Sequence, residues 1–253
     1  MPHLAVDGHA LDYVVHGDAA RPGTLVFLHE GLGSVGLWRR FPEELCQQTG
    51  RGGVVYSRYG YGWSDVAPRT RRPDYMHHEA LVVLPAVLDA LDARRPVLIG
   101  HSDGASIALI ATGAGVVDAE RLVLLAPHVF VEDVSIAGIE AARVAYETTD
   151  LPARLARHHR DADATFWGWN DIWLAPAFRA WNIEGYLGGV TCPVLSIQGL
   201  DDQYGTLAQL DAIGAGVAGP WERMVLADCG HSPQLDRPDA TVDAVSRACR
   251  RAP

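Results

Sequence analysis

The sequence predicts an α/β fold in which a mostly parallel sheet is flanked by helices and carries one helical insertion. Three observations predict it. Short apolar runs recur along the chain, segments with helical spacing lie between them, and Gly-containing turns follow several of the runs. Strands buried on both faces of a parallel sheet have this continuous apolar character. A length of 253 residues suits one such domain.

The N-terminal part of the chain contains a predicted hairpin and two predicted central strands. Residues 3–16 are expected to form two short strands, because Asp7-Gly8 lies between them as a hairpin signal. Residues 24–29 are apolar almost throughout, which indicates a central strand. Residues 53–57 form a similar run and predict the next strand.

A helix is expected after each of these two central strands. The first covers residues 36–48, beyond a Gly-rich turn. The second covers about residues 75–93, beyond a basic loop that is interrupted by proline. Its leucines keep helical spacing, at Leu81, Leu84, Leu88 and Leu91.

Three later runs and a closing helix complete the predicted sheet domain. The runs at residues 121–126, 193–198 and 223–227 are short and mainly apolar, and each predicts a strand. The segment that begins at Pro238 predicts the closing helix.

Residues 130–188 interrupt this alternation and are predicted to form a helical cap insertion. They divide the core domain into residues 1–129 and 189–253, and four of the seven tryptophans lie in them. Open α/β sheets bind ligands beyond the carboxyl ends of their strands, where such an insertion would lie. Its aromatic residues therefore either form a small core of their own or face a ligand cavity. The candidates for the cavity are Trp167, Trp169 and Trp173.

The segment Gly100-His-Ser-Asp-Gly104 is the organising motif of the chain. It follows the apolar run at residues 97–99 and precedes an Ala/Leu/Ile-rich stretch at residues 105–112, so it joins a predicted strand to a predicted helix. G-x-S-x-G in this position is typical of a nucleophile elbow, a strained turn that exposes a serine hydroxyl. The glycines allow the strand and the helix to pass closely. The helix N-terminus and the Asp103 N–H would then face an oxyanion that forms beside Ser102.

Two later strand ends supply an acid and a base for this serine. Asp201 and Asp202 follow one predicted strand, and His231 follows the next in a Gly-His turn. The order Ser, Asp, His on successive loops is the order expected for an elbow nucleophile. Asp202 is preferred to Asp201 as the acid, although the two also fit a plain turn. The predicted catalytic residues are therefore Ser102, Asp202 and His231.

These motifs resemble those of the α/β-hydrolase superfamily, and the resemblance covers nearly the whole chain. Residues 29–38, His-Glu-Gly-Leu-Gly-Ser-Val-Gly-Leu-Trp, resemble the family's oxyanion loop. The resemblance implies a serine carboxylesterase-like enzyme with a cap domain at the insertion. It also implies a second oxyanion donor at the Gly31 N–H, beside the Asp103 N–H.

Two residues depart from the family pattern. The family usually has Gly where Glu30 stands, and often Asp where Arg58 stands. Since both positions end neighbouring strands in that fold, we expect Glu30 and Arg58 to pair near the floor of the site, which would leave no lone buried charge. The alternative is that each is solvated separately. Glu30 is also a candidate for the substrate pocket.

The composition excludes several other classes of protein. A net charge of −10 argues against nucleic-acid and anionic-membrane partners, and no apolar run reaches 18 residues. No signal peptide is evident, and the four separated cysteines suit a reduced, cytoplasmic protein. No cofactor and no metal ion is expected. The oligomeric state stays open, a homodimer included.

The predicted function is hydrolysis of small-to-medium carboxylic esters through an acyl-enzyme. An aromatic insertion predicts a largely apolar pocket for the small-molecule ester. The same three residues also serve lactone hydrolysis and C–C bond hydrolysis, and fold and triad do not separate these reactions. A slow-turnover small-molecule binding protein is the alternative from a different class.

Overall fold

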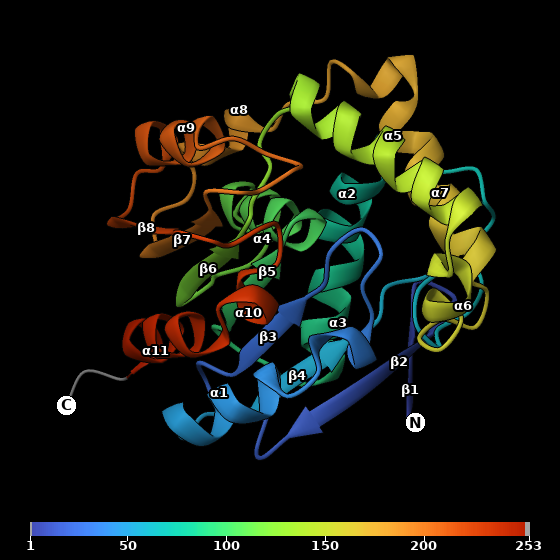
Figure 1. The fold of residues 1–253 in the computed structure, drawn as a ribbon. Coiled ribbons are helices and arrows are strands. Elements are labelled where there is room, and N and C mark those ends of the chain that lie inside the picture. Colours follow the sequence, from blue (N-terminus) through green and yellow to red (C-terminus); the bar gives the residue numbers. More distant parts are fainter. Residues whose placement is uncertain (1, 251–253) are drawn as a thin grey trace.

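The computed structural model describes residues 2–250 and has one eight-stranded sheet at its centre (Figure 1). The strands lie in the order β1-β2-β4-β3-β5-β6-β7-β8. Pairing is antiparallel at the β1–β2 and β2–β4 contacts and parallel at all the others. The mostly parallel α/β architecture predicted from the sequence is therefore confirmed. The strands are β1 (His3–Val6), β2 (His9–His16), β3 (Leu25–Leu28), β4 (Gly53–Tyr56), β5 (Val97–His101), β6 (Arg121–Leu125), β7 (Val194–Gly199) and β8 (Trp221–Leu226).

Helices cover both faces of the sheet, and each face has its own hydrophobic cluster. α1 and α11 pack on one face, while α3 and α4 pack on the other. No helix within residues 2–250 combines the length and apolarity needed to cross a bilayer. The helices are η1 (Val35–Trp38), α1 (Phe41–Thr49), α2 (Tyr75–His78), η2 (Glu79–Val83), α3 (Leu84–Ala90), α4 (Asp103–Gly113), α5 (Asp133–Thr148), α6 (Leu151–Leu155), α7 (Ala162–Leu174), η3 (Pro176–Phe178), α8 (Glu184–Leu187), α9 (Ala208–Gly216), α10 (Pro233–Asp236) and α11 (Pro238–Cys249).

Two predicted helices are interrupted in the structure. The helix expected over residues 36–48 is divided at Arg39, whose φ of 53° does not fit a right-handed helix. The helix expected over about residues 75–93 contains a π-helical turn, η2, which ends at Val83, two residues before Pro85. Because proline lacks an N–H and crowds the preceding turn, it does not continue the regular hydrogen-bond ladder.

The segment between β6 and β7 contributes helices and no strand to the sheet within the described residues. It is closed at its base by an antiparallel bridge between Phe130 and Asn182. α5 and α7 pack against each other, and Figure 1 shows them together with α6 at one side of the sheet domain. Several aromatic side chains form a core within this segment, since Tyr146 stacks on Phe166 with ring centroids 3.8 Å apart.

Candidate active site

Ser102 lies in a strained turn between β5 and α4. Its φ of 52° and ψ of −116° are unusual for a residue with a side chain. The turn also brings backbone segments into close contact. A Cβ added to Gly100 would lie 2.4 Å from the carbonyl oxygen of Gly104, and one added to Gly104 would lie 1.9 Å from that of Leu28. Only glycine fits at either position.

Two backbone N–H groups near Ser102 are left without acceptors. Asp103 is the first residue of α4, so its N–H has no partner within the helix. Neither this N–H nor that of Gly31 donates to any acceptor in residues 2–250. Gly31 lines the same cavity as Ser102. The two predicted oxyanion donors are therefore free to bind an acceptor on a ligand.

The loops after β7 and β8 bring a histidine and a carboxylate together. A Cβ on Gly199 would lie 2.0 Å from the Cys229 carbonyl oxygen, so glycine at this position lets the two loops touch. The Asp201 N–H donates to that same carbonyl at 2.9 Å. His231 Nδ1 then lies 2.9 and 3.0 Å from the two carboxylate oxygens of Asp202. The structure brings Asp202, and not the exposed Asp201, to the histidine.

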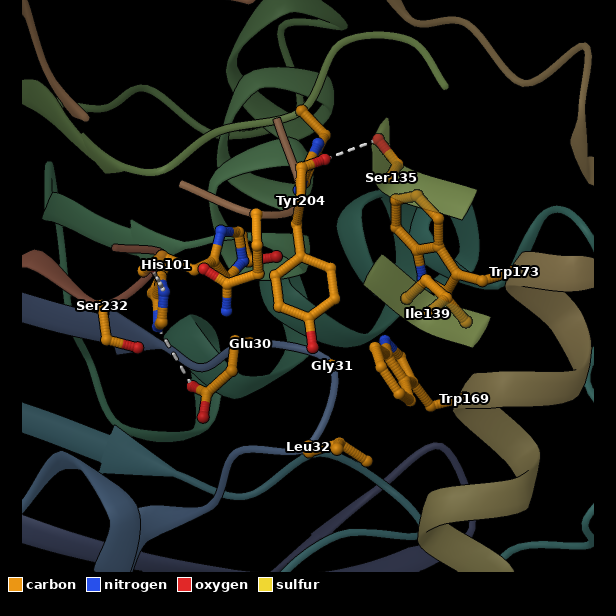
Figure 2. Close-up of a pocket in the computed structure, with 14 residues that line it drawn as sticks. Glu30, Gly31, Leu32, His101, Ser135, Ile139, Trp169, Trp173, Tyr204 and Ser232 are labelled. Atoms are coloured by element: carbon orange, nitrogen blue, oxygen red, sulfur yellow. Dashed lines mark hydrogen bonds and ion pairs between the residues drawn. The ribbon is translucent and has the colours of Figure 1, made fainter. Parts of the chain in front are cut away.

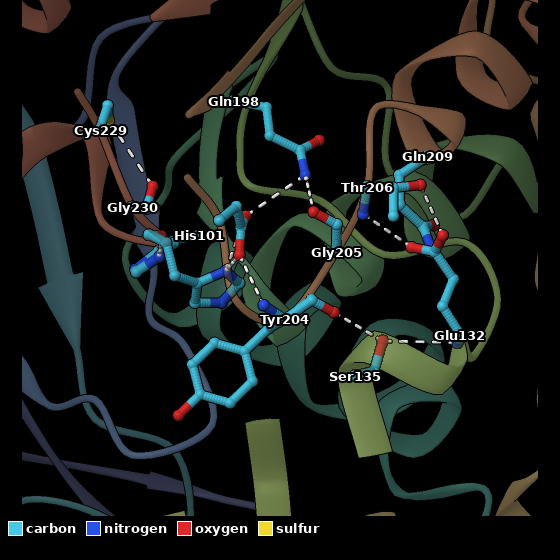
Figure 3. Close-up of polar contacts among 12 residues, drawn as sticks. His101, Glu132, Ser135, Gln198, Tyr204, Gly205, Thr206, Gln209, Cys229 and Gly230 are labelled. Atoms are coloured by element: carbon cyan, nitrogen blue, oxygen red, sulfur yellow. Dashed lines mark hydrogen bonds and ion pairs between the residues drawn. The ribbon is translucent and has the colours of Figure 1, made fainter. Parts of the chain in front are cut away.

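The environment of Asp202 keeps its carboxylate ionised. Burial alone would raise the pKa of Asp202, but hydrogen bonds from His231 and from the Tyr204 N–H outweigh it and hold the pKa below its ordinary value. Gln198 adds a further contact at 3.3 Å (Figure 3). Because an ionised carboxylate only accepts hydrogen bonds, His231 donates through Nδ1 and its Nε2 is left as an acceptor.

Ser102 and His231 both line one cavity of about 200 Å³. Figure 2 shows this cavity with Glu30, Tyr204 and Trp169 among its labelled lining residues. No hydrogen bond joins the Ser102 hydroxyl to the His231 ring or to any other group in the described part of the chain. The cavity is lined by Glu30, Gly31, Leu32, His101, Ser102, His128, Ser135, Ile139, Trp169, Trp173, Gln203, Tyr204, His231 and Ser232.

The predicted pocket residues divide into two groups. Glu30, Trp169 and Trp173 line the cavity. Trp167 does not line it. Its ring instead packs beneath the guanidinium groups of two arginines, with centroid distances of 4.7 Å to Arg69 and 5.8 Å to Arg143.

The predicted ion pair between Glu30 and Arg58 is absent, which corrects the sequence-based expectation. The Glu30 carboxylate lies 3.3 Å from His101 Nδ1, while the Arg58 guanidinium lies 3.4 Å from Asp103. Arg58 contacts Glu30 only through the backbone carbonyl, at 2.9 Å. The Glu30 carboxylate and the Arg58 guanidinium therefore each have an ionisable partner, as expected for charged groups in the interior, but they are not partners of each other.

Several cavity residues were not predicted from the sequence. His128 follows the end of β6, and its strand-end position was a signal that could have identified it, because the carboxyl ends of parallel strands converge. His101 lies inside the elbow motif and contacts both Glu30 and the His231 carbonyl. Ser135, Ile139 and Tyr204 carry no such signal, since they come from helices and loops whose packing decides their direction.

A strained serine between a strand and a helix, with a His–Asp pair on two later loops, defines the hydrolase class of the α/β fold. Comparison with known protein families supports the same class. The model of the Alpha/beta hydrolase family matches residues 25–244, and the chain belongs to this family. No curated protein matches the sequence.

Solved structures with the same fold cover almost the whole chain. The enol-lactonase from Burkholderia xenovorans LB400 has 20% identity and a TM-score of 0.77, over 97% of this chain and 98% of that one. Est816, described as an N-acyl homoserine lactone degrading enzyme, has 25% identity and a TM-score of 0.73, over 96% and 98%. The esterase EaEST from Exiguobacterium antarcticum has 20% identity and a TM-score of 0.75, over 98% of both chains.

Proposed function

We propose that this protein is a serine hydrolase that cleaves small carboxylic esters through Ser102, His231 and Asp202. The observation that carries the proposal is the contact of His231 Nδ1 with the Asp202 carboxylate, at the wall of the cavity that Ser102 also lines. A base with a free Nε2, oriented by an ionised acid and facing a serine, is the arrangement that activates a hydroxyl nucleophile.

In the proposed reaction the Ser102 hydroxyl attacks the ester carbonyl while His231 Nε2 accepts its proton. The oxyanion of the tetrahedral intermediate is held by the unpartnered N–H groups of Gly31 and Asp103, each worth about 3 kcal/mol of barrier in comparable sites. His231 then protonates the leaving alcohol, and an acyl-enzyme remains on Ser102. Water, activated by the same histidine, releases the acid and restores the serine.

The size of the cavity supports a small substrate. About 200 Å³ is below the range of roughly 300–1,000 Å³ for sites that take drug-sized ligands. Its wall is partly aromatic, with Trp169 and Trp173 from α7, and Ser135 and Ile139 come from α5. Because residues 130–188 supply these walls, we also propose that they act as a cap over the site, as the sequence predicts.

Lactone hydrolysis is the second candidate function. It is supported by the fold similarity to an enol-lactonase and to Est816, and a cyclic ester needs the same nucleophile and base. Both reactions leave an acyl group on Ser102.

Two measurements test the proposal. Wild-type protein should hydrolyse p-nitrophenyl acetate and butyrate, and Ser102→Ala should lower the turnover number by about 10³-fold or more. A fluorophosphonate probe should label the wild-type protein on Ser102 and leave Ser232, the other cavity serine beside His231, unmodified. Negligible turnover and no labelling in wild type would refute the hydrolase and favour a binding protein.

A further inference from the structure

Glu30 is a carboxylate in the cavity wall that the proposed acyl transfer does not use. It lies one residue before Gly31, the proposed oxyanion donor, and its side chain is 27% exposed into the cavity. An anion next to a developing oxyanion would oppose the reaction unless its charge is balanced. The surroundings of Glu30 must therefore supply that balance.

The buried His101 balances Glu30. Its Nδ1 lies 3.3 Å from Glu30 Oε2 and its Nε2 lies 2.7 Å from the backbone carbonyl oxygen of His231 (Figure 2). Burial lowers the pKa of His101, but the hydrogen bond and charge of Glu30 outweigh it and raise the pKa. Burial likewise opposes ionisation of Glu30, and His101 brings its pKa to about 2. Gln234 Nε2 also lies 3.1 Å from His101 Nδ1. When His101 is protonated, as its raised pKa favours, it forms a charged pair with Glu30 beside the oxyanion loop.

One oxygen of the Glu30 carboxylate is engaged and the other is not. Oε2 faces His101 and lies close to Gly33, where an added Cβ would be 2.4 Å from it. Oε1 forms no ion pair and no hydrogen bond with another side chain in the described residues. An ionised oxygen at a cavity wall gains most from a hydrogen-bond donor and repels another anion.

We propose that Glu30 is a specificity residue that accepts a hydrogen bond from a hydroxyl or ammonium group lying close to the scissile carbonyl of the substrate. The proposal rests on the proposed hydrolase function of the same cavity. It narrows the substrate class to hydroxy-acyl or amino-acyl esters and excludes esters with a second carboxylate at this point. His101 acts through Glu30 and is a positioning residue.

The test compares four methyl esters of similar size by titrating the released acid. Methyl propionate carries no substituent, methyl lactate offers a hydroxyl, alanine methyl ester offers an ammonium, and monomethyl succinate adds a carboxylate. Each is measured on wild type, on Glu30→Gln, and on Glu43→Gln as a control. Glu43 is exposed on α1, so the control loses the same charge far from the cavity.

We expect wild type and Glu43→Gln to prefer methyl lactate or alanine methyl ester over methyl propionate by about tenfold or more in kcat/KM, since hydrogen bonds to charged groups have this strength. Whichever ester is preferred identifies the donor. In Glu30→Gln the preference should fall to about threefold or less, and monomethyl succinate should be hydrolysed faster than by wild type. A change in Glu30→Gln that is equal for all four esters, or no change, would overturn the proposal.

Recognition of a hydroxyl or ammonium group by Glu30 can be tested even if the protein does not hydrolyse esters. If wild type hydrolyses none of the esters, binding of the same four to wild type and to Glu30→Gln is measured by saturation-transfer NMR. If wild type binds the hydroxyl or ammonium ester more strongly and Glu30→Gln does not, Glu30 recognises that group even though the protein does not hydrolyse the ester. Equal binding of all four by both proteins would overturn it.

Discussion

The hydroxyl of Tyr75 lies 2.7 Å from a carboxylate oxygen of Asp103, the residue that follows Ser102. The same hydroxyl accepts a hydrogen bond from Trp173 Nε1 at 3.1 Å. The Asp103 oxygen is also 3.4 Å from the buried Arg58 guanidinium. This chain of contacts ties α7, which lines the cavity, to the first residue of α4, whose N–H is a proposed oxyanion donor.

Replacing Tyr75 with phenylalanine should therefore destabilise the protein. The change removes a donor from Asp103 and leaves the Trp173 N–H without an acceptor, at a cost of about 1–3 kcal/mol in the free energy of unfolding. Urea unfolding followed by tryptophan fluorescence measures it. Tyr59→Phe is the control, because its hydroxyl makes no hydrogen bond in residues 2–250 and its ring stacks on His9. Equal stability of the two variants would contradict this role of Tyr75.

Asp202→Asn should inactivate the enzyme while the protein stays folded. An asparagine amide at this position can donate to His231 Nδ1 and so stabilise the tautomer whose Nε2 carries the proton and cannot act as a base. We expect the turnover of p-nitrophenyl acetate to fall about 10³–10⁴-fold. Asp201→Asn, with the same chemical change at the exposed neighbour, should retain activity. The opposite pattern would assign the acid to Asp201.

Gly104→Ala should destabilise the elbow. The new Cβ would lie 1.9 Å from the Leu28 carbonyl oxygen, a backbone atom that cannot move aside without shifting β3. Forced overpacking costs about 1–3 kcal/mol or more. Gly185→Ala is the matched control, because no heavy atom lies within 4 Å of its added Cβ and α8 gains a better helix former. Thermal unfolding midpoints should fall for the first variant and hold or rise for the second.

Much of the sheet could be predicted from the sequence because central strands are continuous apolar runs, as Leu25–Leu28 shows. The interruptions of the helices could be predicted less well. Arg39 adopts a positive φ although no glycine marks the position. Pro85 does carry a signal, but a proline in a periodic segment does not reveal whether the helix ends or widens there.

The candidate site was likewise only partly predictable from the sequence. The strand ends locate Ser102, Asp202 and His231, whereas the partner of Glu30 depends on side-chain directions that no local pattern encodes. The difference between Trp167 and Trp169 was available from helix geometry. Residues two apart on a helix point about 200° apart, so both could not face one cavity, while Trp169 and Trp173 lie on one face.

The Glu30–His101 pair predicts a loss of stability in acid. The pKa of Glu30 is about 2 in the folded protein, against an ordinary value of 4.5. Between these values the unfolded carboxyl takes up a proton that the folded one does not, so the stabilisation is lost as the pH falls from about 5 towards 2. Glu30→Gln alone would leave the buried His101 without its carboxylate partner, so both side chains are replaced together. Thermal midpoints at pH 6 and pH 3.5 should therefore differ less in the double variant Glu30→Gln, His101→Gln than in wild type. Parallel shifts in the two proteins would contradict the ionised pair.

The buried His128 predicts a second loss of folding stability in acid, and this loss has a different cause. Burial, aided by repulsion from His231, lowers the pKa of His128 from 6.5 to about 3. Between these values the unfolded imidazole binds a proton and the folded one stays neutral, so His128 makes folding less favourable as the pH falls below about 6.5. His128→Gln should therefore lose less stability between pH 7 and pH 4 than wild type, as measured by urea unfolding at each pH. His3→Gln, at an exposed position, should follow wild type, and a His128→Gln profile that also followed wild type would show that burial of a neutral imidazole at this site carries no pH-dependent cost.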